Sequence, residues 1–384
     1  MESIVTSHIR LGIIAGGQLA KMLIQEASKW DIQTYVLDAD PACPAGRLAT
    51  RHVRGSHLDY DAVYQFGQQV ELITFEIENV NIAALRRLQS EGKKIIPDPA
   101  VLELIRDKGL QKQFYADHQL PSAPFRLFEH ADQIRAAVAT GELALPFVQK
   151  VRQGGYDGRG VAVMQTERDL DQLLPGPSLT EDLVSIAREL AVIVARNDSG
   201  QTIAYDPVEM TFNAEQNLVE NLIYPALIDP ELANQARQIA LTIIQKLDMR
   251  GVLAVELFVD ERQQIIINEI APRPHNSGHH TMESVITSQF EQHLRAILNL
   301  PLGSTRLKLP AVMVNLLGAP GYSGPVKYSG LTDSMAIEGV KIHIYGKAET
   351  RPWRKMGHAT ILADNIEDAI VKANRVSNLI QIKT

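Results

Sequence analysis

Residues 251–280 read GVLAVELFVDERQQIIINEIAPRPHNSGHH and hold two apolar runs on either side of a polar turn. Such runs, rich in Val and Ile and separated by turn residues, predict an antiparallel hairpin. A turn centred near 261–262 would place Glu269 opposite Ala254. Because the side chains of a strand return to the same face every two residues, Glu256 and Glu269 would then share one face.

The two glutamates of this hairpin predict a bound cation. Two carboxylates buried on one face repel each other unless a positive charge lies between them. Mg²⁺ prefers hard oxygen ligands, so Glu256 and Glu269 are candidate metal ligands, with Asn268 beside them. A general acid/base pair and two solvent-exposed glutamates at a sheet edge are the alternatives.

A second hairpin is predicted at residues 150–163, KVRQGGYDGRGVAV, where a glycine-rich tip separates two apolar runs. Glycine allows positive φ angles and lets backbone N–H groups approach a ligand closely, and several such donors in a row form a nest for an anion. Lys150 and Arg159 add positive charge. The tip is therefore predicted to bind phosphate, and a flexible, solvated turn is the alternative. Its glycines are Gly154, Gly155, Gly158 and Gly160.

A phosphate loop, a lysine and a pair of candidate Mg²⁺ ligands together predict that ATP binds through its phosphates. Behind the glutamates, the run RPHNSGHH is dense in hydrogen-bond donors. Its first polar residues are candidates for holding a small anion near the γ-phosphate: Arg273, His275, Asn276 and Ser277. Taken singly, His275 is also consistent with a histidine of the core whose hydrogen bonds are satisfied.

Residues 9–40 alternate strand, glycine turn, helix and strand, which predicts a small doubly wound α/β unit ending near 97–99. Its turn, GIIAGGQL, would place backbone N–H groups at a helix N-terminus, which favours anions. Ala15 and Ala20 stand where the dinucleotide fingerprint has glycines, so NAD is only weakly indicated. The alternatives are a tight βα turn and a site for another polar ligand beside Gln18.

The remaining chain predicts a helical stretch at 100–118, then short strands in antiparallel hairpins that a helix at about 230–248 interrupts. We predict three units from these changes of pattern. They are an α/β unit at 1–105, a central α+β unit at 106–302 and a small C-terminal unit at 303–384.

The composition is that of a globular protein, with 45% hydrophobic and 22% charged residues over 384 positions. A single cysteine, Cys43, leaves no disulfide framework within the chain and favours a reducing, cytoplasmic compartment. We find no apolar run of about 18 residues, so no membrane segment is predicted. The net charge of −7, without a dominant basic block, argues against nucleic acid as the main partner.

Several motifs appear in order along the chain: GGQL, TFEIENV, GGYDGRG, TEDLVSIARE, INEIAPRPHNSGH, VNLLG and YGKAETRPWRKMGH. Their order and spelling resemble the ATP-grasp superfamily and, within it, the family of 5-(carboxyamino)imidazole ribonucleotide synthases of purine biosynthesis. The resemblance implies an N-terminal doubly wound pre-ATP-grasp domain, an α+β ATP-grasp domain of two subdomains and a small β-rich C-terminal domain. The resemblance spans nearly the whole chain. The specific motifs are the APRPHNSGH run and the run YGKAETRPWRKMGH.

The resemblance also implies roles for residues that bind ATP. Lys108 matches a basic residue that contacts nucleotide phosphate, although arginine is common there, and Lys150 matches the phosphate lysine. The loop that closes over ATP corresponds to Gly155, Tyr156, Asp157, Gly158, Arg159, Gly160 and Val161. The linker that reads adenine corresponds to Glu181, Asp182, Leu183 and Val184, and the acid that binds ribose to Glu189. Asn268 and Glu269 complete the ATP site, with Glu256 and Glu269 as the Mg²⁺ ligands.

For the second substrate, the resemblance implies that Lys347, Arg354 and Lys355 hold the 5′-phosphate of aminoimidazole ribonucleotide. A solvated basic strand is the alternative for this run. The implied reaction is ATP-dependent carboxylation of that ribonucleotide by bicarbonate through carboxyphosphate, with Arg273, His275 and Asn276 as catalytic residues. A homodimer is also implied.

The chain departs from the family pattern at two places that do not include the metal ligands or the glycine-rich loop: the alanines of the N-terminal turn and the sequence around Asn213. The role of Asn213 therefore stays open. The rival interpretations are another ATP-grasp enzyme, such as a formate-using transformylase or a biotin carboxylase, and a non-catalytic nucleotide-binding regulator. The C-terminal motif argues against the first. The presence of Glu256, Glu269 and Arg273 argues against the second.

Overall fold

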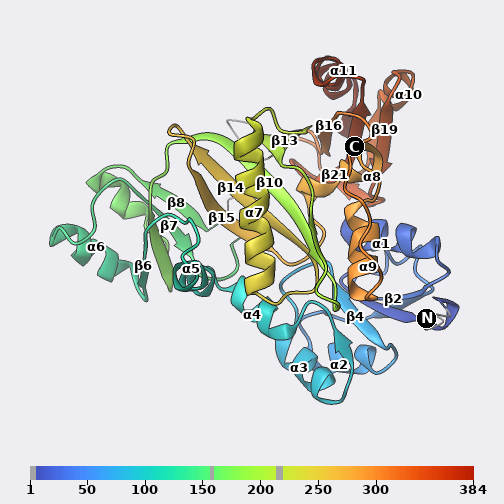
Figure 1. Cartoon of the computed structure of the whole chain (residues 1–384), viewed down its shortest axis with the longest axis horizontal. Coiled ribbons are helices and arrows are strands. Elements are labelled where there is room, and N and C mark those ends of the chain that lie inside the picture. The colour runs from blue at the N-terminus through green and yellow to red at the C-terminus, as the bar shows by residue number, and fades with distance from the viewer. Residues whose placement is uncertain (1–5, 156–159, 213–218) are drawn as a thin grey trace.

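The structure is a computed structural model, and it describes residues 6–155, 160–212 and 219–384 (Figure 1). Its N-terminal part contains a five-stranded parallel sheet in the order β3-β2-β1-β4-β5. The strand order reverses beside β1, as in doubly wound folds, which confirms the predicted α/β class. The strands are β1 (Arg10–Ile14), β2 (Gln33–Asp38), β3 (Arg51–Arg54), β4 (Leu72–Phe75) and β5 (Lys94–Ile95).

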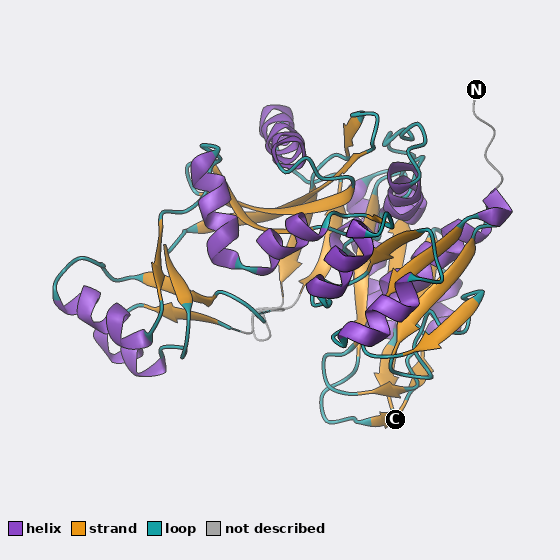
Figure 2. Ribbon diagram, turned by 90° about the horizontal axis from the view of Figure 1, so that it is seen from below, coloured by secondary structure: helices purple, strands orange, loops and turns teal. Residues whose placement is uncertain are grey.

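Helices cover both faces of this sheet. One face packs on α2 and α3, and the other packs on α1 together with α9, which comes from the middle of the chain (Figures 1 and 2). Buried Leu23 of α1 and Leu294 of α9 belong to one core cluster, so the N-terminal sheet shares its core with the central part of the chain. The helices are α1 (Gln18–Ser28), α2 (Tyr60–Gly67), α3 (Ile82–Ser90) and α9 (Gln289–Ile297).

Two helices, α4 (Pro99–Arg106) and α5 (Lys108–Asp117), lie where one helical stretch was predicted at 100–118. The break falls at Asp107, whose backbone is extended. Its side chain accepts hydrogen bonds from Gly109 N and Leu110 N, at 2.8 and 3.2 Å, and so caps α5. The cap sets the position of Lys108 at the first turn of α5.

A small antiparallel sheet in the order β6-β9-β7-β8 follows, and it projects to one side of the molecule (Figure 1). Strands β7 and β8 form the hairpin predicted at 150–163. The apolar side of this sheet packs on α6 and a 3₁₀ turn at Glu167–Gln172. The elements are β6 (Phe125–Phe128), α6 (Ala131–Ala139), β7 (Phe147–Val151), β8 (Val161–Met164) and β9 (Ser178–Asp182).

The large antiparallel sheet has the order β15-β14-β10-β12-β13-β16-β21-β19, with β11 added beside β10. It joins the central and C-terminal parts of the chain, because β13 pairs with β16 antiparallel. Helix α7 (Pro230–Lys246) covers one face near β10 and β14 (Figure 1). The central strands are β10 (Ile186–Arg196), β11 (Thr202–Ala204), β12 (Val208–Phe212), β13 (Val219–Tyr224), β14 (Gly251–Asp260) and β15 (Ile265–Ala271).

The C-terminal strands carry α11 (Ile366–Leu379) on one face, where it buries Ala369, Ala373 and Val376. Between the central and C-terminal parts lie a 3₁₀ turn at Asn276–Gly278 and α8 (Thr281–Ser284). The remaining elements are β16 (Ala311–Leu317), β17 (Gly324–Pro325), β18 (Lys327–Ser329), α10 (Leu331–Met335), β19 (Val340–Ile344), β20 (Glu349–Thr350), β21 (Lys355–Leu362) and β22 (Gln381–Lys383).

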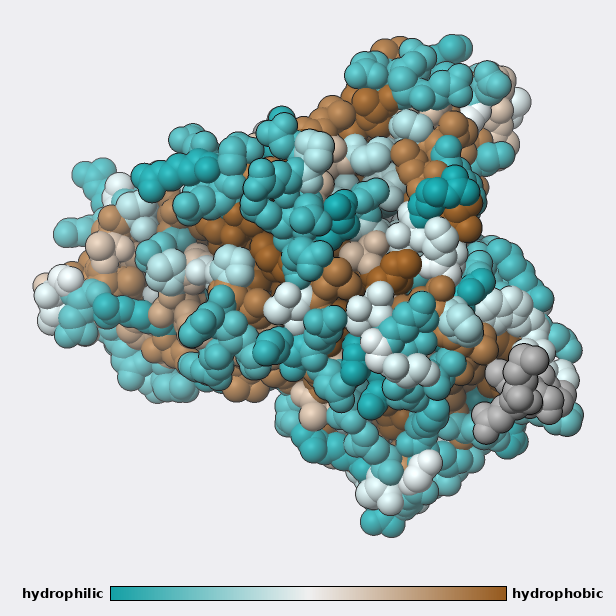
Figure 3. Space-filling model, viewed as in Figure 1, coloured by the Kyte–Doolittle hydropathy of each residue, from teal (hydrophilic) through white to brown (hydrophobic). Residues whose placement is uncertain are grey.

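On the face shown in Figure 3, hydrophilic side chains cover the protruding parts, and hydrophobic ones are seen mainly where those parts meet. Within the described ranges, no helix has both the length and the apolar character needed to cross a bilayer.

Candidate active site

Three glutamates line one face of the large sheet. Strands β14 and β15 pair with Glu256 directly opposite Glu269, and not with Ala254 opposite Glu269 as predicted. The register differs because a bulge follows Glu256: Leu257 pairs with Ile267, so Asn268 is the extra residue. Directly opposite residues share a face, so the prediction that the two glutamates lie on the same face is confirmed. Glu189 of β10 lies opposite Phe258, two residues from Glu256, and so joins that face.

The charges on this acidic face are not balanced by its own residues. Burial, followed by the negative charges of Glu269 and Glu189, raises the pKa of Glu256 to about 8. Burial also raises the pKa of Glu189, to about 7. Burial alone would raise the pKa of Glu269 as well, but the ammonium groups of Lys108 and Lys150 outweigh it and lower that pKa. An added cation would therefore find an electronegative surface at Glu256.

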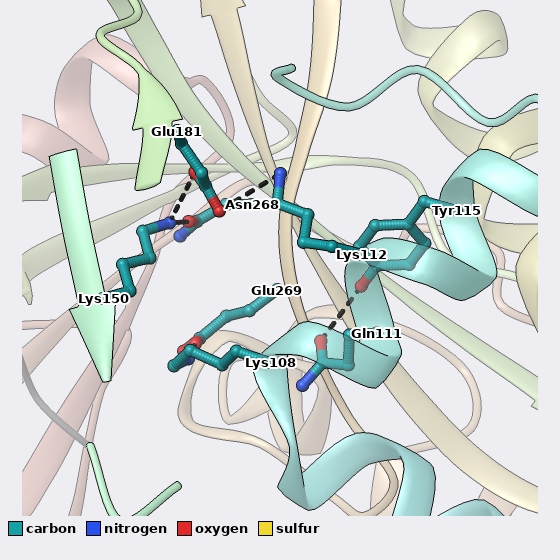
Figure 4. A pocket seen from close by; sticks show the side chains of 8 residues that line it. All are labelled: Lys108, Gln111, Lys112, Tyr115, Lys150, Glu181, Asn268 and Glu269. Atoms are coloured by element: carbon teal, nitrogen blue, oxygen red, sulfur yellow. Dashed lines mark hydrogen bonds and ion pairs between the residues drawn. The ribbon is translucent and has the colours of Figure 1, made fainter. Parts of the chain in front are cut away.

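Lysines from two other elements meet the acidic face, as Figure 4 shows. Lys108, the first residue of α5, forms an ion pair with Glu269. Lys150 of β7 contacts the Oδ1 atom of Asn268 at 3.1 Å and the Oε2 atom of Glu181 at 3.0 Å. The other Glu181 oxygen, Oε1, lies 3.1 Å from the Nζ atom of Lys112.

We call Lys108, Lys112, Lys150, Glu181 and Glu269 the nucleotide cluster. With Gln111, Tyr115 and Asn268 they line one pocket between α5, β7, β9 and β15 (Figure 4). The sequence analysis missed Lys112. The signal was present, because Lys112 is four residues after Lys108 and falls on the same face of α5. Lys112 is almost completely buried, and burial lowers its pKa despite the nearby Glu181 carboxylate.

The glycine-rich hairpin leads into this pocket through Lys150. Gly154 and Gly160 both have positive φ, at 79° and 77°, as the glycine-based prediction required. A Cβ atom on Gly160 would lie 2.4 Å from the Cγ2 atom of Val151, so the hairpin closes tightly at its base. Gly155 and Val161 lie on either side of the tip. The predicted contacts of Tyr156, Asp157, Gly158 and Arg159 lie outside the described residues, as does Asn213.

The small sheet presents an apolar surface beside the same lysine. In its register, Leu127, Lys150 and Val161 share one face, and Glu181 and Val163 belong to that face as well. Leu127, Val161 and Val163 are 43%, 39% and 46% exposed, which is unusual for side chains of this type in a sheet. The segment after β9 continues this surface with Asp182, Leu183 and Val184, and Leu183 is 40% exposed. The surface suits a flat aromatic base.

Residues 273–277, which follow β15, meet the acidic face at His275. The Nε2 atom of His275 lies 3.6 Å from the Oε1 atom of Glu256. Ser277 N donates to the Nδ1 atom of His275 at 3.3 Å, so the proton of the neutral ring lies on Nε2. Burial, with the charges of Arg273 and Lys355, lowers the pKa of His275 to about 3, and the ring is neutral at pH 7. Asn276 bonds Asn315 of β16 at 3.0 Å and is thereby fixed.

Arg273 connects this run to the N-terminal sheet. Its Nε atom lies 2.8 Å from the Oε1 atom of Glu78, which follows β4. Nearby Glu76 accepts hydrogen bonds from Gly17 N and from Ala20 N, the latter at 2.8 Å. The N–H groups of the N-terminal glycine turn are therefore already bonded to a carboxylate of the chain, which supports the interpretation as a tight βα turn. Sequence reasoning gave no role to Glu76 or Glu78.

We call Lys347, Arg354 and Lys355 the C-terminal basic run. Lys347 donates to the carbonyl oxygen of Lys355 at 2.7 Å, and Arg354 donates to that of Glu349 at 2.7 Å. Burial, followed by the charge of Arg354, lowers the pKa of Lys347 to about 8. The charge of Lys355 lowers the pKa of Glu256 and of His275, and Glu76 acts on Lys347. The run thus lies within electrostatic reach of both the acidic face and the N-terminal sheet.

The donor set fits a magnesium ion that is shared with a ligand. Among the described residues, no group of three or more His, Cys, Asp or Glu side chains is arranged to hold a metal by itself. Mg²⁺ is commonly bound by one or two carboxylates together with substrate phosphates, so the pair Glu256 and Glu269 is sufficient. Burial, followed by the charges of Glu269 and Glu189, raises the pKa of Glu256, and a bound cation would oppose both effects and favour its carboxylate form.

Comparisons with known families agree with this geometry. Residues 9–106 match the ribonucleotide synthetase preATP-grasp domain, residues 113–290 the ATP-grasp domain, and residues 311–372 the phosphoribosylaminoimidazole carboxylase C-terminal domain. The N5-carboxyaminoimidazole ribonucleotide synthase of Synechococcus elongatus is 37% identical over 368 residues, which are 94% of this chain and 91% of that protein. The chain spans 65% of the phosphoribosylaminoimidazole carboxylase of Vigna aconitifolia, at 35% identity.

Solved structures give the same result. The N5-carboxyaminoimidazole ribonucleotide synthetase of Thermotoga maritima is 40% identical, with a TM-score of 0.90 over 98% of this chain and 99% of that one. The N5-carboxyaminoimidazole synthase of Aspergillus clavatus, solved with ADP and 5-aminoimidazole ribonucleotide, has a TM-score of 0.89 at 30% identity. It covers 97% of this chain and 99% of that one.

Proposed function

The chain belongs to the family of N5-carboxyaminoimidazole ribonucleotide synthases, and on that premise we propose that it carboxylates 5-aminoimidazole ribonucleotide with ATP and bicarbonate. The observation that carries the proposal is the meeting of three parts of the chain at one acidic face. Lys150 and Glu181 come from the small sheet, Arg273 and His275 follow β15, and the C-terminal basic run acts on Glu256 through the charge of Lys355.

ATP binds between the small sheet and the acidic face. Its base packs on the exposed apolar surface of β6 and β8 and is read by the linker from Glu181 to Val184, while Glu189 binds the ribose. Lys108 and Lys150 bind the phosphates, and the glycine-rich tip covers them from Gly155 to Val161. Glu256 and Glu269, with Asn268 beside them, would hold Mg²⁺, which would supply neutralisation of the phosphate charge.

Arg273, His275 and Asn276 hold bicarbonate next to the γ-phosphate. The protonated Nε2 atom of His275 points toward Glu256, and the ring stays neutral over the physiological pH range, so it donates a hydrogen bond without accepting a proton. Arg273, fixed by Glu78, supplies the positive charge that an anion requires. The C-terminal basic run binds the 5′-phosphate of the ribonucleotide.

The reaction follows in two steps. A bicarbonate oxygen attacks the γ-phosphorus and the bond to ADP breaks, which gives carboxyphosphate. The exocyclic amine of the ribonucleotide then forms a C–N bond to the carboxyl carbon, phosphate leaves with the bonding electrons, and the amine loses a proton. Carboxyphosphate and the CO₂ released from it are alternative carbon donors. The chain contributes positioning and charge neutralisation, and a closed tip excludes the water that would hydrolyse carboxyphosphate.

The direct test measures ADP formation with each substrate omitted in turn. We expect turnover that requires both bicarbonate and 5-aminoimidazole ribonucleotide. Turnover with formate or with biotin in place of the ribonucleotide would identify another ATP-grasp enzyme, and ATP binding without turnover under any of these conditions would identify a nucleotide-binding regulator. We also propose a cytoplasmic location, which the single cysteine favours, and a homodimer, which the family resemblance implies; light scattering of the purified protein tests the dimer.

A further inference from the structure

Lys112 occupies a place in the nucleotide cluster that the proposed function does not use. Its Nζ atom has three acceptors: Glu181 Oε1 at 3.1 Å, Ser122 Oγ at 2.5 Å and the carbonyl oxygen of Ala123 at 3.4 Å. An ammonium group has three N–H donors, so all of them are directed at protein atoms. The Lys112 side chain is 3% exposed and is therefore fixed and dry.

Glu181 forms ion pairs with two lysines at once. Its side chain is 8% exposed, and its two oxygens face different lysines, Lys112 and Lys150 (Figure 4). The two lysines differ in their other contacts. Lys150 also reaches Asn268, next to the proposed phosphate and metal ligands, whereas the other contacts of Lys112 are with Ser122 and Ala123.

The binding of ATP changes this arrangement. When Lys150 bonds to a phosphate, it must share or give up its contact with Glu181. A buried carboxylate left without a cation is strongly unfavourable, so the release of Lys150 depends on what else neutralises Glu181. Lys112 is the group in place to do so, because it contacts Oε1, the Glu181 oxygen opposite to the one that Lys150 contacts, and its other contacts are with Ser122 and Ala123.

We propose that Lys112 is a positioning residue that keeps Glu181 neutralised and oriented while Lys150 transfers to the phosphates of ATP. This inference rests on the proposed function to the extent that ATP is the ligand. Lys112 touches neither the phosphates nor the second substrate in this proposal. Without it, Lys150 is retained by Glu181, and the affinity for ATP falls.

The test is a double-mutant cycle read by ATP binding, measured by calorimetry without bicarbonate or ribonucleotide. Lys112→Met removes the charge and keeps the length of the side chain. We expect it to weaken ATP binding by roughly tenfold or more in the wild-type background. In a Glu181→Gln background no buried charge has to be neutralised, so the same change should weaken binding by less than about threefold.

Equal losses in both backgrounds would overturn the proposal, because a merely structural lysine has no reason to depend on the charge at position 181. No loss in the wild-type background would overturn it as well. If Lys112→Met does not give folded protein, Lys112→Gln, which retains donors for Ser122 and Ala123, takes its place in the cycle. Wild-type protein that does not bind ATP would refute the proposed function itself, a result distinct from either outcome of the cycle.

Discussion

The nucleotide cluster and the C-terminal basic run are both proposed to bind phosphate groups, but their charges are compensated differently. In the nucleotide cluster, Lys108 pairs with Glu269, and Lys112 and Lys150 share Glu181. In the basic run, Lys347 and Arg354 donate to main-chain carbonyl oxygens, and neither forms an ion pair with a carboxylate in the part of the chain that is described. Burial, followed by the charge of Arg354, lowers the pKa of Lys347 to about 8 in this setting.

This difference predicts two modes of anion binding. The nucleotide cluster must exchange internal ion pairs for contacts with ATP, so its affinity depends on how each freed carboxylate is neutralised. Lys347 and Arg354 donate to main-chain carbonyl oxygens, so a phosphate that binds to these two side chains gains charge-assisted hydrogen bonds without displacing a carboxylate from either of them. Substitutions in the first region should therefore disturb a network, whereas substitutions in the second should remove single contacts.

The largest effect is expected for Glu269→Gln in the nucleotide cluster. The change keeps the shape, removes one negative charge from the proposed Mg²⁺ site and breaks the ion pair with Lys108. We expect kcat to fall by about 10²-fold or more, the scale for losing an electrostatic catalytic contact. Glu261→Gln, in the exposed turn of the same hairpin, is the matched control and should leave kcat unchanged. Near-normal turnover at saturating Mg²⁺ would show that Glu269 is structural.

The parts of the site that local sequence determines could be predicted. The hairpins at 150–163 and 251–280 follow from apolar runs and turn residues a few positions apart, and both are present. The register of the second could not be predicted, because the bulge at Asn268 depends on packing and not on the turn. The break at Asp107 did have a local signal, because an aspartate that caps a helix is typical of a helix start, and Arg152 also binds that carboxylate at 2.8 and 2.9 Å.

The other parts of the site could not be predicted because they depend on contacts between segments that are far apart in the sequence. Glu78, which follows a parallel strand, reaches Arg273 from nearly 200 positions earlier, and periodicity within either segment carries no information about this pairing. The pairing of β13 with β16, which continues the large sheet into the C-terminal part, is non-local in the same way. Lys112 is different: its spacing from Lys108 placed both on one face of a helix, so the sequence held the signal.

The second prediction isolates the basic run. Arg354→Ala removes one charge-assisted contact with the ribonucleotide phosphate, for which about 1.5–3 kcal/mol is typical. We expect the KM for 5-aminoimidazole ribonucleotide to rise roughly tenfold or more, with the KM for ATP nearly unchanged. Arg375→Ala, on the exposed side of α11, controls for loss of an arginine from the same part of the chain. If Arg354→Ala weakened both substrates equally, the basic run would not be specific to the second one.

The smallest effect concerns pH and follows from the lowered pKa of Lys347. Its ammonium is charged below about pH 8 and loses its proton above that value, while the substrate phosphate, with a second pKa near about 6, is already fully charged. The value of kcat/KM for the ribonucleotide should therefore fall roughly threefold between about pH 7.5 and 8.5. Unfolding does not explain such a loss: with a lowered folded-state pKa, the Lys347 contribution to the free energy of unfolding rises with pH across this window. Lys347→Arg, which stays charged, should abolish the decline, and a decline that persists in this variant would assign it to another group.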